Sequence, residues 1–277
     1  GGINGLSWEE IERRAQPIAD NTTDPSFRYR SFDGFLGKGE TVASVVASDA
    51  SALAQMSRTM EEIVAGVRSV IEAADRALGK RQNVTVTVEV HGRELQVTRR
   101  WFMSPQYSLF YNDSLPPGSD SAERFNRCWD VEYELATKDG LWLRIGGNAE
   151  AGVLQYMEEL GFCEGGHPSN AYRVDPFVAA AVLFGDIREE CVRVWSERLD
   201  HVRQIELNVP NALEEEEEKC RLLLSTEEVA GDDRERQAAI DTLAWAKQFR
   251  EGIRTKERAL IEEHQRQLEL LRGLVNA

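Results

Sequence analysis

Basic side chains close to aromatic ones are the residues of this sequence best suited to chemistry. Arg28 and Arg30 alternate with aromatic residues in the segment 27–32, and Arg99 and Arg144 fall in segments that alternate like strands. Guanidinium groups donate paired hydrogen bonds to carboxylates and phosphates, so such arginines favour an anion or an acidic peptide as ligand. The candidate ligand-binding residues are Arg28, Arg30, Lys38, Arg99, Arg144 and Arg173.

Lys38 belongs to a glycine-rich segment that comes nearest to a phosphate-binding loop. The segment reads Gly-Phe-Leu-Gly-Lys-Gly-Glu-Thr over residues 34–41 and precedes an apolar helical pattern. A P-loop needs Ser or Thr directly after the lysine to reach magnesium, and a buried strand before the glycines. Both features are missing, so no nucleotide cofactor is expected, although the amides of a helix N-terminus can still hold an anion.

A metal site and a nucleophile are poorly supported by the remaining reactive residues. Cys163 and His167 are four residues apart and Asp175 lies downstream, but zinc sites use four ligands in closely spaced pairs, and a second pair is absent. No Gly-x-Ser-x-Gly motif occurs. We therefore expect no metal and no cofactor, and we assign no catalytic residues, because a catalytic triad can also be assembled from distant parts of a chain.

Two β-hairpins are expected to hold the arginines in the middle of the chain. From Asn83 onward valine alternates with Thr and Glu, and a two-residue turn at His91-Gly92 predicts a hairpin over residues 84–102. A second hairpin is expected over 129–145. A three-residue loop, Lys138-Asp139-Gly140, is the one that keeps its apolar residues on one face, with Leu135 opposite Leu143 and Glu134 opposite Arg144.

Segments with apolar residues at helical spacing lie before and after these hairpins, and such segments make up most of the C-terminal part of the chain. Helices are expected over 7–20, 41–57, 59–79 and 149–160, with Thr59-x-x-Glu62 as a capping box and Gly161-Phe162 as a Schellman cap. We expect an α+β body over 1–185, with a small antiparallel sheet packed with helices. A long all-helical region is expected over 186–277, similar to a helical hairpin or a coiled coil, with helices near 187–202, 212–225 and after 231.

Composition narrows the classes of partner. The 277 residues carry a formal net charge of −15, which repels a phosphate backbone and an anionic membrane surface. No stretch approaches the length of a membrane-spanning apolar helix. The four cysteines are scattered and show no disulfide pattern, which is typical of a reduced compartment. We expect a cytoplasmic acidic protein that binds neither nucleic acid nor membrane.

Two functions remain as hypotheses. The first is a non-enzymatic interaction, scaffold or adaptor protein that binds another protein or a second copy of itself, self-associating as a homo-oligomer or docking through its C-terminal helices. The alternative is an enzyme, or a protein that binds a small anion or a peptide, with a dispersed site near loops 27–39 and 163–173. Both loops are long and rich in turn-forming residues, which is where binding sites concentrate.

Overall fold

The computed structural model describes residues 2–16, 35–36, 39–79, 83–164, 173–197, 199–200, 218, 221 and 233–276. Contacts divide the chain into two compact units. One unit consists of Gly1–Cys191 together with Leu270–Ala277, and the other of Val192–Glu269. The boundary expected at residue 185 stays a prediction.

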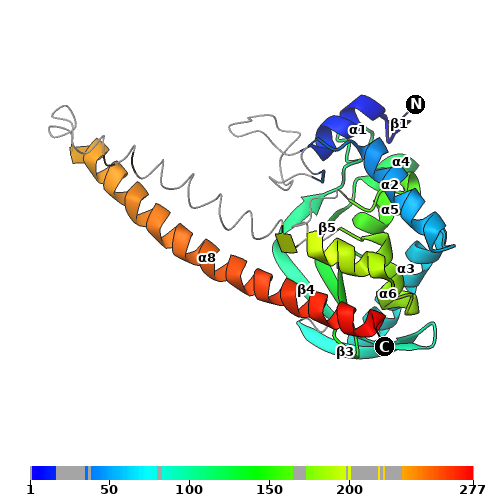
Figure 1. Cartoon of the computed structure of the whole chain (residues 1–277). Coiled ribbons are helices and arrows are strands. Elements are labelled where there is room, and N and C mark those ends of the chain that lie inside the picture. The colour runs from blue at the N-terminus through cyan, green and yellow to red at the C-terminus, as the bar shows by residue number, and fades with distance from the viewer. Residues whose placement is uncertain are drawn as a thin grey trace. The chain divides into compact units, whose positions relative to one another are not determined.

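The first unit is built on a four-stranded antiparallel sheet in the order β3-β4-β5-β6 (Figure 1). The strands are β3 (Val84–Val90), β4 (Arg93–Tyr107), β5 (Cys128–Thr137) and β6 (Trp142–Gly146). Helices pack with this sheet, so the expected α+β class is confirmed.

Both hairpin registers agree with the sequence. Across the turn at His91-Gly92, where both residues have positive φ, Val86 faces Val97 and Val88 faces Leu95. The second hairpin closes through a loop over residues 138–140, and the Thr137 amide donates a hydrogen bond to the Leu141 carbonyl at 2.8 Å. Its glycine has a φ of 95°, a conformation that side chains rarely adopt.

Pairing of β4 with β5 joins the two hairpins into one sheet, a step that local sequence patterns did not predict. Val97 lies opposite Leu135, and Leu135 lies opposite Leu143, so one apolar row crosses the sheet. These three side chains are at most 2% exposed. The row forms the centre of the buried face.

Two helices, α3 (Met60–Leu78) and α6 (Pro176–Phe184), pack on the sheet. Helix α3 buries a stripe at helical spacing, consisting of Ile63, Val67, Val70, Ile71, Ala74 and Leu78. Gly66 permits close approach of the two helices, because a Cβ there would lie 3.2 Å from atoms of both Leu183 and Phe184.

The expected capping signals set where the helices begin and end. The Thr59 hydroxyl accepts from the Glu62 amide and the Glu62 carboxylate accepts from the Thr59 amide, which starts α3 separately from α2 (Val42–Gln55). At the end of α5 (Val153–Leu160), Gly161 is left-handed and the Phe162 amide donates to the carbonyl of residue 156. This is the predicted Schellman cap.

Helix α5 begins later than the expected residue 149. The Asn148 side chain accepts hydrogen bonds from the amides of Glu150 and Ala151, which makes a turn before the helix. Gly152 follows with a φ of 93° and forms a bridge with Gly147. This turn and bridge hold the chain out of helical geometry until Val153.

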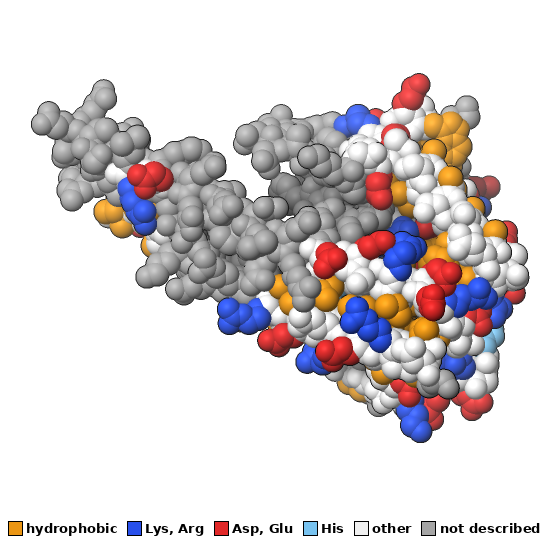
Figure 2. Space-filling model, viewed as in Figure 1, with side chains coloured by type: hydrophobic (Ala, Val, Ile, Leu, Met, Phe, Trp, Pro, Cys, Tyr) orange, Lys and Arg blue, Asp and Glu red, His pale blue; other side chains and the backbone are white. Residues whose placement is uncertain are grey.

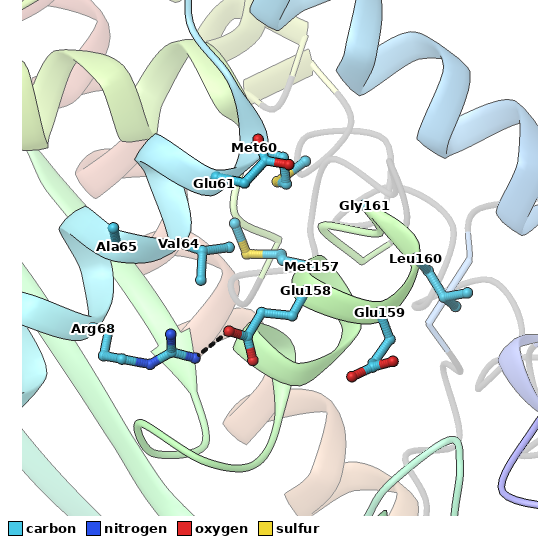
Figure 3. A pocket seen from close by; sticks show the side chains of 10 residues that line it. All are labelled: Met60, Glu61, Val64, Ala65, Arg68, Met157, Glu158, Glu159, Leu160 and Gly161. Carbon is cyan, nitrogen blue, oxygen red and sulfur yellow. Dashed lines mark ion pairs between the residues drawn. The ribbon is translucent and has the colours of Figure 1, made fainter.

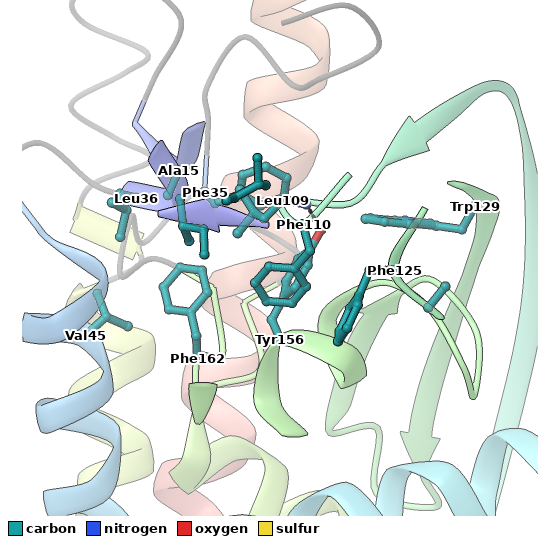
Figure 4. Close-up of a cluster of buried hydrophobic side chains, with 13 residues drawn as sticks. Ala15, Phe35, Leu36, Val45, Leu109, Phe110, Phe125, Trp129, Tyr156 and Phe162 are labelled. Atoms are coloured by element: carbon teal, nitrogen blue, oxygen red, sulfur yellow. Dashed lines mark hydrogen bonds between the residues drawn. The ribbon is translucent and has the colours of Figure 1, made fainter. Parts of the chain in front are cut away.

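A second hydrophobic cluster lies at the N-terminal end of this unit (Figure 4). Short strands β1 (Gly2–Ile3) and β2 (Leu6–Ser7) precede α1 (Trp8–Ala15), and α4 (Asp120–Phe125) lies between β4 and β5. Tyr156 lies at the centre of this cluster. Its ring is in edge contact with the rings of Phe35, Phe110 and Trp129. Phe162 of the Schellman cap packs into the same cluster.

The second unit is helical where it is described. Residues 192–197 continue a helix from the first unit, and α8 (Asp233–Val275) is the long final helix that the sequence predicts. The Trp195 and His264 rings lie 5.0 Å apart. The helix expected over 212–225 lies almost wholly outside the described residues, and the coiled-coil prediction stays a prediction. None of the described helices is long and apolar enough to span a bilayer.

Substitution of Gly152 by Ala tests the close approach that precedes α5. A Cβ at this position would lie 2.3 Å from the Gly146 carbonyl oxygen, so the backbone must move. We expect the free energy of unfolding in urea to fall by about 3 kcal/mol or more. Gly118 is the matched control, because it also has positive φ but open space around it; Gly118→Ala should cost only about 1 kcal/mol. Equal losses would contradict the steric argument.

Candidate functional site

The three candidate cations that the structure describes do not converge on one site. Arg28, Arg30 and Lys38 lie outside the described residues. Arg99, Arg144 and Arg173 are described, and each pairs with a carboxylate of the chain itself. Arg99 and Arg144 occupy opposite faces of the sheet, since Arg99 stands in the row of Tyr133 and Ile145 while Arg144 belongs to the adjacent row.

Arg99 fastens the end of helix α3 to the sheet. Its guanidinium donates to Asp75 Oδ1 at 2.8 Å and to the Gly79 carbonyl at 2.8 Å. Tyr133 donates its hydroxyl to the same Asp75 oxygen at 2.6 Å. Arg99 is only 9% exposed, so these partners, rather than a ligand, compensate its charge.

Arg144 takes part in a balanced ion network on the other face. Its Nε lies 2.9 Å from Glu134, as the hairpin register predicted, and its guanidinium lies over the Trp142 ring. Arg100 bridges Glu134 and Glu132. Two arginines therefore meet two carboxylates. The visible face of the described chain likewise shows acidic and basic side chains interspersed (Figure 2).

Arg173 belongs to a buried polar cluster between α2, the segment after α5 and the start of α6. Its guanidinium lies 2.6 Å from Asp49, 3.9 Å from Asp175 and 2.6 Å from the Glu164 carbonyl. Asp175 also caps α6 by accepting from two amides. One guanidinium is thus shared by two carboxylates, and the cluster ties three segments together.

Burial changes the protonation chemistry of this cluster. Loss of water around Asp49, which is 1% exposed, raises the pKa of its carboxyl to about 6 despite the opposing charge of Arg173. Burial also raises the pKa of the Cys163 thiol well above its ordinary value. A buried thiol that stays protonated is a poor nucleophile. Among the described residues, no group of His, Cys, Asp and Glu could hold a metal ion.

A groove of about 450 Å³ lies between α3 and α5 (Figure 3). Successive turns of α3 contribute Met60 and Val64, and the end of α5 contributes Met157. Val64 and Met157 are nearly inaccessible, so they form the floor, and Met60 is half-buried. Ala65, Leu160 and Gly161 complete the apolar lining.

The rim of the groove is acidic. Three of its side chains are carboxylates, Glu61, Glu158 and Glu159, and one is basic, Arg68. Arg68 pairs with Glu158 at 2.6 Å. A hydrogen bond from its own backbone amide, with a second from Thr59, lowers the pKa of the exposed Glu61 carboxyl. Because Glu158 pairs with Arg68 and Glu159 pairs with Arg124, the negative balance of the rim comes from Glu61.

Met60 links the groove to the buried cluster, because its sulfur lies 3.9 Å from Cys163 Sγ. No spacing in the sequence pointed to this groove, since its two walls are about ninety residues apart. The sequence signal for the groove is a methionine on each of two amphipathic helices. In the sequence, these methionines cannot be distinguished from ordinary core residues, because the packing of the two helices is not known. Chemically, the groove offers apolar contact and carboxylates but no described nucleophile.

The pH dependence of stability tests the buried cluster. The folded chain holds a proton on Asp49 more tightly than the unfolded chain, so this group adds stability as pH falls through its folded pKa of about 6. Between pH ~7.5 and pH ~5, wild type should gain about 1.4 kcal/mol relative to Asp49→Asn, which cannot titrate. Urea unfolding of both chains at both pH values measures it. A relative loss on acidification would mean that Arg173 outweighs burial.

Comparison with known proteins identifies no relative from which a function could be transferred. No protein-family model matches the chain, and no curated protein or solved structure matches it. Function must therefore be inferred from the geometry and charge of the described residues.

Proposed function

We propose that this chain is a non-enzymatic protein-interaction module that binds a partner protein through the α3–α5 groove. The single observation that carries the proposal is the groove's composition, with two methionines and a valine inside and carboxylates around them. Methionine is flexible and polarizable, and it adapts to the apolar side chains of a partner. A volume of about 450 Å³ accommodates one or two such side chains.

Charge indicates which partner the groove fits. Two of the three rim carboxylates pair with arginines and Glu61 leaves the rim with a negative balance, while the whole chain carries a net charge of −15. A segment with apolar side chains flanked by Lys or Arg would be attracted to this site, whereas an acidic segment would be repelled. We therefore propose a basic amphipathic helix of another protein as the occupant.

Self-association or docking through the C-terminal helices remains part of the proposal. Helix α8 has 43 residues, and a straight helix of this length spans about 65 Å. Ile240 on this helix is 43% exposed. Within the described part of the chain, residues 270–276 belong to the first unit, and Leu271 among them is 1% exposed. Removal of the whole helical region would therefore disturb the first unit as well.

Methionine methyl resonances provide the test of the groove. The chain has four methionines, and Met60 and Met157 line the groove, whereas the buried Met56 does not. With ¹³C-methyl-labelled methionine, a helical peptide of leucines flanked by lysines should shift the Met60 and Met157 resonances and leave that of Met56 in place. The same peptide with Glu in place of Lys should bind more weakly.

Two charge reversals on α3 supply the matched control. Glu61→Lys should weaken binding of the basic peptide by about fivefold, because it reverses a rim charge. Glu72→Lys makes the same change in net charge at an exposed site on α3 outside the groove, and it should have little effect. Equal effects of the two variants, or tight binding of the acidic peptide, would remove the proposal.

A second candidate function, an enzyme or a protein that binds a small anion or a peptide near loops 27–39 and 163–173, is favoured by one observation. Phe35 and Phe162, next to or within these segments, pack into the same cluster around Tyr156. One described residue of the first loop and one residue beside the second therefore pack against the same tyrosine. The pairing of Arg173 with Asp49 weighs against this candidate, because an anion would have to compete with a buried carboxylate.

Inorganic phosphate distinguishes the candidates. A bound anion stabilises the folded chain by mass action, so about 10 mM phosphate should raise the thermal midpoint if the second candidate holds. The chloride salt at equal ionic strength is the control. An unchanged midpoint would leave the interaction module as the function to pursue.

A further inference from the structure

Strand β3 is an edge strand without the usual protection of such strands. It lies at one end of the order β3-β4-β5-β6 and reads Val-Thr-Val-Thr-Val-Glu-Val. Exposed edges are normally blunted by lysine, proline or a bulge, because their free amides and carbonyls can pair with another strand. Glu89 is the single charged residue of β3, and Val84 is 37% exposed.

The hairpin register fixes which backbone groups of β3 face outward. In a hairpin closed by two residues, the pair beside the turn, Val90 and Arg93, is hydrogen-bonded, and such pairs then alternate along the ladder. The valines of β3 therefore bond to β4. Thr85, Thr87 and Glu89 direct their amides and carbonyls away from β4, and all three residues are exposed.

A two-fold axis through Thr87 satisfies all these outward groups at once. Antiparallel pairing of β3 with β3 of a second copy sets Thr87 opposite Thr87 and Thr85 opposite Glu89, each in a hydrogen-bonded position. Three such pairs exchange about six hydrogen bonds. Between them, Val86 faces Val88 and Val84 faces Val90, so valines on the helix-covered side meet valines.

The charge pattern suits this pairing in an acidic chain. Two copies with a net charge of −15 each repel one another, and a close contact must avoid opposing carboxylates. In the Thr87-centred register each Glu89 faces a threonine. The Thr85 and Thr98 hydroxyls lie 2.7 Å apart on this face, which shows that threonines here already form hydrogen-bonded cross-strand pairs.

We propose that two copies of this chain associate through β3, with Thr87 on the two-fold axis, to form a continuous eight-stranded antiparallel sheet. This interface uses residues of β3, none of which lines the α3–α5 groove. The side-by-side strands bury Val84 and extend the sheet of the first unit across the dimer.

Charge swapping at Thr87 tests the axis. Sedimentation equilibrium of the full chain at about 100 µM should give the mass of a dimer. Thr87→Lys and Thr87→Glu each place two like charges across the axis and should raise the dimer dissociation constant by more than about tenfold. An equimolar mixture of the two variants should restore association. Thr87→Val, which is neutral and β-branched, should associate as wild type does, and unchanged thermal midpoints would show that the variants are folded.

Three results would overturn the inference. A monomeric wild type at about 100 µM removes the interface altogether. Association of Thr87→Lys equal to that of wild type would move the contact elsewhere, such as to α8, and would leave the groove proposal untouched. Failure of the mixture to associate, when each variant alone has dissociated, would show that Thr87 does not face its own copy.

Discussion

The first unit depends on how helix α3 is held. One side of α3 is buried along its length, and its end is fastened by the hydrogen bonds that Arg99 and Tyr133 direct to Asp75. Burial of each large aliphatic side chain contributes about 1.5 to 3 kcal/mol, so this stripe is a major source of stability. Gly66 on α3 allows α6 to approach α3 closely, because it has no side chain. A helix fixed in this way can present its remaining side, with α5 beside it, as a preformed groove.

Described arginines of the sheet and of the buried cluster pair with carboxylates of the same chain. Arg99, Arg144 and Arg173, the described candidates for ligand binding, each pair with a carboxylate of the same chain, and their binding of a ligand stays a prediction. Removing a carboxylate partner from a buried arginine costs several kcal/mol, so Arg99 and Arg173 have a structural role whatever else the protein binds. Among the described residues, two features are open to partners: an apolar groove with an acidic rim and an edge strand with one charged residue. Both features are the basis for our proposal that the chain binds other proteins.

The parts that sequence alone predicted are those governed by neighbours in the chain. Alternation of valines together with the glycine at position 140 determined both hairpin registers, and capping residues such as Thr59 and Gly161 located helix ends. The pairing of β4 with β5 joins segments about forty residues apart, and no local pattern encodes it. The partner of Arg173 was equally hidden, because Asp49 sits within α2, 124 residues away, and looks like a solvent-facing helix residue until the tertiary fold buries it.

Native-state hydrogen exchange, resolved by residue, tests the central position of α3 most directly. Amides exchange through openings whose free energies range from near zero to that of global unfolding. If α3 holds the unit together, its amides and those of β4 and β5 should exchange last and with the same free energy. Exchange of α3 through a smaller opening, while the sheet stays protected, would show that α3 is peripheral and that the groove is not preformed.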